Sequence, residues 1–503
     1  MLFRSDATDA SGRTPLSYCA ELGNYYICKL LLDRGAAIDA ADSTGRTPLS
    51  HGTTYRGILQ DAFACELLLN RGAAVDATDA SGRTPLSYCA ELGNYNICKL
   101  LLDRGAAVDA ADSSGYTPLS YGAEAGSYSA CELLLNRGAA VDATDASGRT
   151  PLSYCAELGN YSICRLLLDR GTTVDTADDN GRTPLSYSAE TRANSVCRLL
   201  LNRGAAVDFA DAGGHTILSL CARLGNYSIC ELLLDRGATV DAVDFSGRTP
   251  LSYCAELAND SICKLLLDRG AAIDVPDTGG RTPLSYCVEH GNRITCEFLL
   301  GGGATVDAAD SRGHTPLSYC ATSWPQDSAV CNLLLDRGAT VDATDFRGRT
   351  PLSLCAEVGS HHICQLLLDR GAAVDATDAS GRTPLSYCVE LSRLEFCEVL
   401  LDRGATVDLA DSSGRTPLSY CAELGSDSVC ELLLDRGAAV DATDASGRTP
   451  LSYCAELNRR HICQLLLSRN GNAYLPDVKG YTPLWYARGQ GESNSIYQLL
   501  WEH

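Results

Sequence analysis

Apolar residues come along the chain in pairs of short bursts, which Gly, Asn and Asp separate. Residues 79–111, DASGRTPLSYCAELGNYNICKLLLDRGAAVDAA, show the pattern. Thr84 suits the N-cap of a helix, and Pro85 suits its first position because the missing N–H is not needed there. Gly93 favours a left-handed stop. The pattern therefore predicts a short first helix over residues 85–92.

The second apolar burst predicts a second helix. Asn94 can cap it and Gly105 can end it. Between them, apolar residues recur at helical spacing at Ile97, Cys98, Leu100 and Leu101. Residues 106–115 are rich in Asp, Ser and Gly, which indicates a hairpin-like turn beside the helix pair.

This unit recurs along the whole chain. The Thr of the TPLS motif, or of its variants TILS and TPLW, is used below as the reference threonine. It occurs in fifteen repeats: Thr14, Thr47, Thr84, Thr117, Thr150, Thr183, Thr216, Thr249, Thr282, Thr315, Thr350, Thr383, Thr416, Thr449 and Thr482. Twelve of the fourteen spacings are 33 residues; the second repeat is longer by four residues and the tenth by two. Such a period predicts a solenoid, and we expect residues 1–503 to form a single array.

Charge and hydropathy narrow the class of partner. The net charge is −22 and the pI is near 4.7, which argues against nucleic acid because its binding needs a local excess of positive charge. The N-terminal MLFRSDATDA lacks the apolar core of a secretory signal. No apolar run approaches the ~18–20 residues that span a bilayer. We expect a cytoplasmic protein, with a nuclear location also possible, whose thiols are reduced.

The repeat resembles the ankyrin repeat: Asp, Gly, Thr-Pro-Leu, a small-residue pair, Gly, a run of leucines and Gly-Ala match nearly position for position. The resemblance implies a mainly α fold, in which helix-turn-helix units with hairpin-like loops stack into a curved, elongated solenoid. Turn tips and first helices would line its concave face. This chain departs from the family by carrying Ser where His usually follows Thr-Pro-Leu, as at Ser17, Ser87 and Ser153. We expect the Ser hydroxyl to bond locally instead.

Residues with possible chemistry fit the repeat better than a reaction. Cysteine recurs five and fourteen residues after the reference threonine, among apolar residues, and this spacing predicts core packing rather than a zinc site. His361 and His362 with Cys364 would be a solvent-facing variant, and Gly301–Gly303 a loosened helix end. No catalytic constellation is visible, so we expect no enzyme activity, no cofactor and no metal.

Two polar rows mark a candidate surface for a partner. The residue before the reference threonine is Arg in eleven repeats, and the seventh residue after it is Glu in eleven. The resemblance places the Arg row at the root of the turns. The candidate residues are Arg83, Tyr116, Arg149, Arg182, His215, Arg248, Arg281, His314, Arg349 and Arg382, together with Glu157 and Glu256. In the alternative interpretation the rows pair with one another, each exposed pair contributing only ~0–1 kcal/mol.

A repeated tyrosine and two longer loops are further candidates for contact with a partner. Tyr lies four residues after the reference threonine and either contacts a partner or is buried between first helices, as at Tyr18, Tyr88, Tyr154, Tyr253 and Tyr387. The second repeat reads HGTTYRGILQDAFAC and the tenth YCATSWPQDSAVC. We predict that these longer loops make specific contacts through Tyr55 and Trp324; tolerated loop drift is the alternative.

These observations favour a non-enzymatic interaction scaffold or adaptor, which binds a protein or extended peptide on its concave face. Residues 470–503 are expected to form a cap-like last repeat, whereas the first repeat lacks a polar outer face. The chain also resembles large fungal ankyrin arrays, some of which belong to NOD-like receptors. One alternative is therefore a ligand-sensing C-terminal segment of a larger receptor of that type, and another is a mechanical spacer.

Overall fold

The computed structural model of the protein describes residues 7–54, 61–323, 328–489 and 495–502. Over these ranges it has thirty helices, no strand, and one isolated bridge between Ala210 and Thr216. The helices come in pairs, one pair per repeat, as the sequence predicts. The chain divides into two compact units, Met1–Phe245 and Ser246–His503, here called the N-terminal and C-terminal units.

Each repeat of the N-terminal unit has a first and a second helix. The first helices are α1 (Pro15–Glu21), α3 (Pro48–Gly52), α5 (Pro85–Leu92), α7 (Pro118–Glu124), α9 (Pro151–Glu157), α11 (Pro184–Glu190) and α13 (Ile217–Leu224). The second helices are α2 (Tyr25–Asp33), α4 (Asp61–Asn70), α6 (Tyr95–Asp103), α8 (Tyr128–Asn136), α10 (Tyr161–Asp169), α12 (Asn194–Asn202) and α14 (Tyr227–Asp235).

The C-terminal unit repeats this order. Its first helices are α15 (Pro250–Glu256), α17 (Pro283–Glu289), α19 (Pro316–Thr322), α21 (Pro351–Val358), α23 (Pro384–Glu390), α25 (Pro417–Leu424), α27 (Pro450–Glu456) and α29 (Pro483–Arg488). Its second helices are α16 (Asp260–Asp268), α18 (Arg293–Gly301), α20 (Ser328–Asp336), α22 (His361–Asp369), α24 (Leu394–Asp402), α26 (Asp427–Asp435), α28 (Arg460–Ser468) and α30 (Ser495–Glu502).

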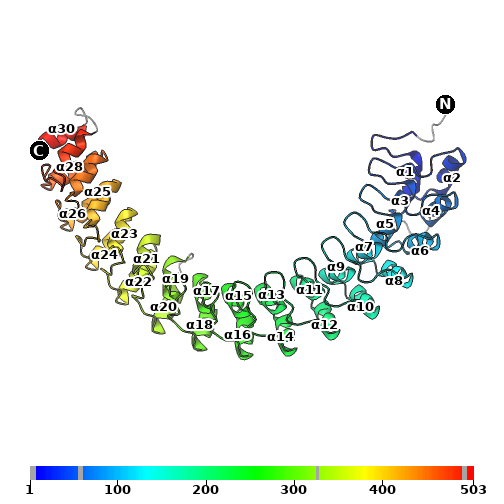
Figure 1. The fold of residues 1–503 in the computed structure, drawn as a ribbon. Coiled ribbons are helices and arrows are strands. Elements are labelled where there is room, and N and C mark those ends of the chain that lie inside the picture. The colour runs from blue at the N-terminus through cyan, green and yellow to red at the C-terminus, as the bar shows by residue number, and fades with distance from the viewer. Residues whose placement is uncertain (1–6, 55–60, 324–327, 490–494, 503) are drawn as a thin grey trace. The chain divides into compact units, whose positions relative to one another are not determined.

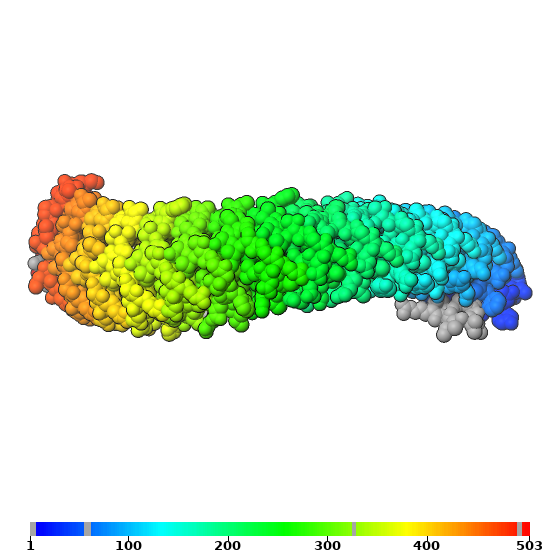
Figure 2. Space-filling model, turned by 90° about the horizontal axis from the view of Figure 1, so that it is seen from below, coloured from blue at the N-terminus to red at the C-terminus, as the bar shows by residue number. Residues whose placement is uncertain are grey.

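Within each unit the helices form two rows. First helices pack against the first helices of neighbouring repeats, as α5 does on α7, and second helices pack against second helices, as α6 does on α8 (Figure 1). The turns project from the row of first helices. In the space-filling view of Figure 2, successive repeats of each unit abut without gaps. Each repeat therefore buries its apolar side chains against its neighbours.

The first helix begins where its capping residues predict. The Ser87 amide donates to Thr84 Oγ1 at 3.3 Å, and the two hydroxyl oxygens lie 3.2 Å apart. The same contact recurs in most repeats, so the Ser that replaces the family's His does bond locally. Helix α5 ends at Leu92, and Gly93 follows with φ +70°. The predicted helix over 85–92 is confirmed.

The second helix also has the predicted bounds, although its cap varies between repeats. The amide of Ile27 donates to Asn24 Oδ1 at 3.2 Å, which is the predicted capping bond. The Asn94 side-chain amide instead donates to the Thr53 carbonyl of the preceding repeat at 3.0 Å. An amide side chain at this position can therefore serve its own helix or join two repeats.

The turns are held by an Asp five residues before the reference threonine. In the fourth repeat, Asp112 Oδ1 accepts the amides of Ser114 at 2.8 Å and Tyr116 at 2.9 Å. The amide of Ser113 donates to the Ser81 carbonyl of the preceding turn at 2.8 Å. One such bond joins each pair of neighbouring turns. The turns therefore form a ladder with a single backbone bond per rung, which is too sparse to be a sheet.

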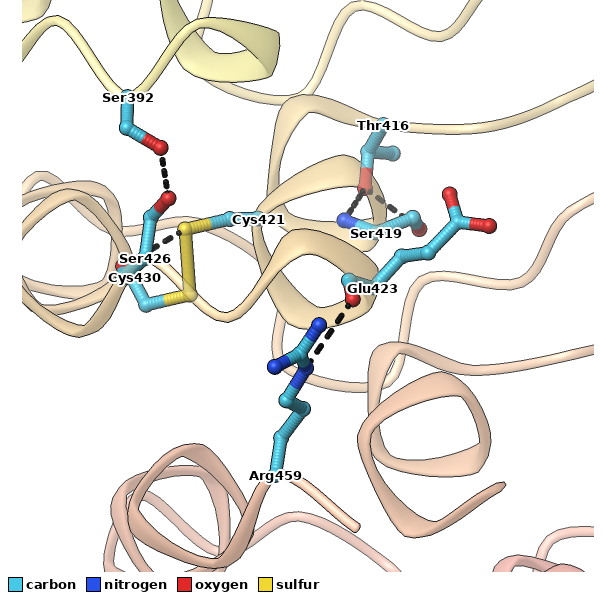
Figure 3. Close-up of a disulfide and its surroundings, with 8 residues drawn as sticks. All are labelled: Ser392, Thr416, Ser419, Cys421, Glu423, Ser426, Cys430 and Arg459. Carbon is cyan, nitrogen blue, oxygen red and sulfur yellow. Dashed lines mark hydrogen bonds between the residues drawn. A yellow bond between two sulfur atoms is a disulfide. The ribbon is translucent and has the colours of Figure 1, made fainter. Parts of the chain in front are cut away.

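Cysteine belongs to the core, as predicted. Every cysteine that the structure describes is buried, and the two of one repeat lie side by side: the Cys98 thiol donates to Cys89 Sγ at 2.8 Å. The expectation that all thiols are reduced is wrong at one place, because Cys421 and Cys430 form a disulfide (Figure 3). Their Cα atoms are 5.7 Å apart, a separation that a disulfide spans.

These thiols are expected to be unreactive in the folded protein. Burial raises the pKa of Cys131 to about 12, which lowers its thiolate fraction at pH 8 by about a thousandfold. Alkylation of Cys131, followed by mass spectrometry of its peptide, should be correspondingly slow in buffer and fast in guanidinium chloride. Labelling of native Cys131 at the rate of a free thiol would contradict its burial.

Candidate protein-binding surface

The two predicted polar rows meet within each repeat. Wherever a repeat has both Arg and Glu, the two form an ion pair; the Nη–Oε distance is 2.6 Å in Arg349–Glu357 and 3.7 Å in Arg182–Glu190. The other pairs are Arg13–Glu21, Arg83–Glu91, Arg149–Glu157, Arg248–Glu256, Arg281–Glu289, Arg382–Glu390, Arg415–Glu423 and Arg448–Glu456. The alternative interpretation, in which the rows pair with one another, is thus confirmed within repeats.

Aromatic rings hold the arginines from both sides. The guanidinium carbon of Arg149 lies 4.0 Å from the ring centroid of Tyr154 in its own repeat and 4.2 Å from that of Tyr187 in the next. Arg83, Arg281, Arg382, Arg415 and Arg448 are sandwiched in the same way. Cation–π contact and the bond to Glu leave each guanidinium group with little freedom.

The same tyrosines also hold the turns in place, through hydrogen bonds to the aspartates of the turns. Tyr187 donates to Asp178 Oδ2 at 2.6 Å, and Asp178 Oδ1 accepts the amides of Asn180 at 2.9 Å and Arg182 at 2.8 Å. Burial alone would raise the pKa of Asp178, but these bonds lower it below the ordinary value for Asp. Each such Asp therefore stays ionised and fixes the root of its turn.

Burial of the tyrosines is confirmed for part of the predicted set. Tyr154, Tyr253 and Tyr387 are buried and Tyr88 is half-buried, whereas Tyr18 in the first repeat is 42% exposed. Burial and the bond to Asp79 raise the pKa of Tyr88 to about 12. Where buried, the ring packs between repeats.

Four repeats replace the Arg of the row with an aromatic side chain: Tyr116, His215, His314 and Tyr481. The Tyr116 ring lies between two tyrosine rings, as the guanidinium group does in other repeats. Its centroid is 5.2 Å from that of Tyr121 and 5.1 Å from that of Tyr154. His215 lies 3.0 Å from Asp211 and 3.5 Å from Asp244.

The third such repeat is the tenth. His314 lies 3.4 Å from Asp310 and 3.6 Å from Asp345, and Thr322 occupies the place of Glu. A cavity of about 420 Å³ opens there, lined among others by Arg281, Glu289, Arg312, His314, Ser318 and Thr322. The smaller side chains leave this space where other repeats have an Arg–Glu pair.

An apolar row, which sequence reasoning missed, lies beside the Glu row. The residue after each Glu is Leu or Val in many repeats, at the end of the first helix. In the C-terminal unit these side chains are 41–49% exposed: Leu257, Val358, Leu391, Leu424 and Leu457. We call them the Leu row. The signal is present in the repeated AEL and AEV, since a residue next to an exposed Glu lies near the same exposed side of a helix.

The carbonyls beside the Leu row are bonded by the next repeat. The Asn292 side-chain amide donates to the carbonyls of Ala255 and Glu256, at 2.8 Å each. Arg459 Nε donates to the Glu423 carbonyl at 3.4 Å (Figure 3). These bonds satisfy orphan carbonyls at the helix end, so the backbone that carries the Leu row is fixed.

The histidine pair, the glycine run and the two longer loops were the other features that the sequence singled out. His362 is exposed as predicted, but His361 is half-buried, a correction that its edge-on contact with Phe396 at 5.3 Å between ring centroids explains. Helix α18 ends at Gly301, and Gly303 has φ +96°, as a loosened helix end predicts. Tyr55 and Trp324 lie outside the described residues.

Among the residues with a described position, no group of three or more His, Cys, Asp or Glu side chains is arranged to hold a metal ion. No helix in the described part of the chain is long and apolar enough to cross a membrane.

Comparison with protein families agrees with the geometry. The family model for ankyrin repeats (3 copies) matches residues 58–145, 137–211, 204–277, 251–345, 328–411, 392–444 and 418–503, and the model for a single ankyrin repeat matches residues 11–43. No curated protein matches the chain significantly. Because these models cover nearly the whole sequence and the helix pairs stack repeat on repeat, the chain belongs to the ankyrin-repeat family.

Proposed function

We propose that the protein is a binding scaffold that holds a partner protein or extended peptide against its turns and first helices. Ankyrin repeats are typically non-enzymatic modules that mediate protein–protein interaction. In this chain, ion pairs and ring stacking hold the side chains of that face in place before a partner arrives. Preorganisation of this kind lowers the entropy cost of binding.

The Leu row carries the proposal. Val358, Leu391, Leu424 and Leu457 follow one another in four consecutive repeats of the C-terminal unit, each more than two-fifths exposed. Single exposed apolar residues are ordinary, but a regular row of them is typical of an interaction surface. The neighbouring Glu row supplies the polar rim that such interfaces have.

The polar candidates would add specificity to this surface. The carboxylate-bearing side chains of Glu157 and Glu256 are 41% and 26% exposed, although each is paired with Arg. We propose that Tyr116, His215 and His314 distinguish their repeats for a partner, because they replace the charge of the row with a ring. The stacked arginines would contribute the outer edges of their guanidinium groups.

Proximity labelling in native cells tests the proposal. The variant Leu391→Asn/Leu424→Asn/Leu457→Asn should fold like the wild type, because surface substitutions usually change stability by only ~0.5 kcal/mol. It should nevertheless lose partners that the wild type labels. A matched control, Leu30→Asn/Ile294→Asn/Phe298→Asn, removes comparably exposed apolar residues from second helices and should keep them.

Two outcomes would count against the proposal. Equal partner lists for the wild type and both variants would remove the Leu row from the binding surface. If the wild type enriched no protein over the labelling enzyme alone, the scaffold itself would be rejected. Circular dichroism of each variant confirms that the helices are intact.

A further inference from the structure

We infer that the turn tips of the tenth and eleventh repeats bind an acidic, extended polypeptide segment that also carries an apolar side chain. The site, called the tip site here, consists of Arg312, Phe346 and Arg347. The inference rests on the proposed scaffold function and names the chemistry of one partner.

The tip site departs from the repeat at two positions. The third and fourth residues before the reference threonine form the turn tip, and in most repeats they are Ala, Ser, Thr or Gly. Here the tips carry Arg312, Phe346 and Arg347. Their backbone is well fixed, since the Phe346 amide donates to the Arg312 carbonyl at 3.0 Å and the Ala379 amide to the Arg347 carbonyl at 2.7 Å.

The aromatic ring is presented to solvent. Phe346 is 79% exposed, among the highest values for any large apolar side chain in the described residues. Its ring rests on the neighbouring turn, where a Cβ added to Gly313 would lie 3.0 Å from Phe346 Cδ1. An exposed but supported aromatic side chain loses little entropy when a partner covers it, which suits an interface anchor.

The two guanidinium groups are available for an anionic partner. Arg312 and Arg347 are exposed, and neither forms an ion pair with any residue in the described ranges. The buried carboxylate of Asp310 is occupied by the amides of Arg312 and His314, at 2.8 Å each. Ten of the eleven arginines of the row, in contrast, are already paired with Glu. Two free cations on a chain of net charge −22 point to acidic side chains of a partner.

The distance between the two arginines favours a bound segment in extended conformation. Arg312 and Arg347 occupy the same position in neighbouring repeats, and helices of stacked repeats lie about 8–10 Å apart. Three residues of extended chain span about 10 Å. Acidic side chains three residues apart could therefore reach both arginines, while the apolar side chain between them covers Phe346.

The cavity of the tenth repeat extends the tip site toward the first helices. Its volume of about 420 Å³ lies beside Arg312, where His314 and Thr322 stand in place of Arg and Glu. A further side chain of the bound segment can enter there. The only other tip Phe, Phe245, is equally exposed, but Gly213 and Ser246 occupy the tip places where the tip site has arginines.

Fluorescence anisotropy with the full chain tests the inference. The probe is a labelled peptide of about twelve residues with Glu at every third position and Leu between. The variant Arg312→Ser/Phe346→Ala/Arg347→Ser installs residues that other repeats carry at these positions, and it should weaken binding at least about tenfold. The control Arg198→Ser/Phe245→Ala/Lys264→Ser removes two exposed cations and one exposed Phe elsewhere and should bind like the wild type.

Specific results would overturn the tip site. One is equal affinity of the tip variant and the wild type for the acidic probe. Another is tighter binding of a peptide with Lys in place of Glu, or of a single-stranded oligonucleotide, to the wild type. Loss of the tip site alone would leave the scaffold proposal standing, because that proposal depends on the partners of the Leu row.

Discussion

Replacing Asp178 with alanine is expected to lower the free energy of unfolding by about 2–4 kcal/mol. Its buried carboxylate accepts bonds from the Tyr187 hydroxyl, from the amides of Asn180 and Arg182 and from Arg182 Nε, so the change leaves four donors without their acceptor. Urea unfolding followed by circular dichroism measures the loss.

The neighbouring residue provides the control. Asp179 has the same charge but is exposed at the turn tip, and its backbone bond to Ser147 at 3.0 Å does not depend on the side chain. Asp179→Ala should change stability by no more than about 0.5 kcal/mol. Equal effects of the two substitutions would mean that net charge, and not the buried acceptor, sets the stability of the turn.

Stability is also expected to fall steeply in acid. Hydrogen bonds from Thr44 and His51 outweigh burial and lower the pKa of Asp42 to about 2; the pKa values of Asp79, Asp145, Asp178, Asp310, Asp411 and Asp477 are lowered as well. Because the folded state favours the ionised form, this stabilisation is complete above pH ~4–5 and is lost as the pH falls toward 2. Urea midpoints measured from pH 6 to pH 2 should decline throughout the lower part of this range.

The tyrosines that donate to these aspartates predict a loss of stability at alkaline pH. Burial and bonds to Asp raise the pKa of Tyr88, Tyr286 and Tyr420 to about 12. The folded state favours the neutral phenol, so its contribution is complete below the ordinary pKa near 10 and is lost as the pH rises through 12. A urea midpoint that stayed constant at both extremes would show that the Tyr–Asp bonds do not stabilise the fold.

The fold was predictable because its signals are local. Thr84, Pro85 and Gly93 mark the ends of a helix by backbone chemistry that needs no neighbour, and the recurrence of this signal in many repeats leaves little ambiguity. The place of Arg149 was not predictable in the same way. Its contact with Tyr187 depends on the distance between repeats, which no single repeat encodes.

The surface was harder to predict than the fold. The Leu row went unrecognised because an apolar residue at the end of a short helix looks like core until burial is known. Phe346 and Arg312 lie in different repeats and meet only through the ladder of turns, so the sequence of either repeat alone does not bring them together. The disulfide between Cys421 and Cys430 was missed because the expected compartment, rather than the geometry of the two positions, decided the expectation.

The ladder of turns makes one junction within a unit much like another. Each turn is bonded to the next through the same backbone amide and carbonyl, as Ser113 is to Ser81 and Ala379 to Arg347. Unequal recombination that excised one 33-residue copy would therefore rejoin compatible edges, and the gene could shorten or lengthen without loss of folding. Natural selection could then adjust the reach of the array separately from its recognition chemistry, provided that the neighbouring tenth and eleventh copies stay together.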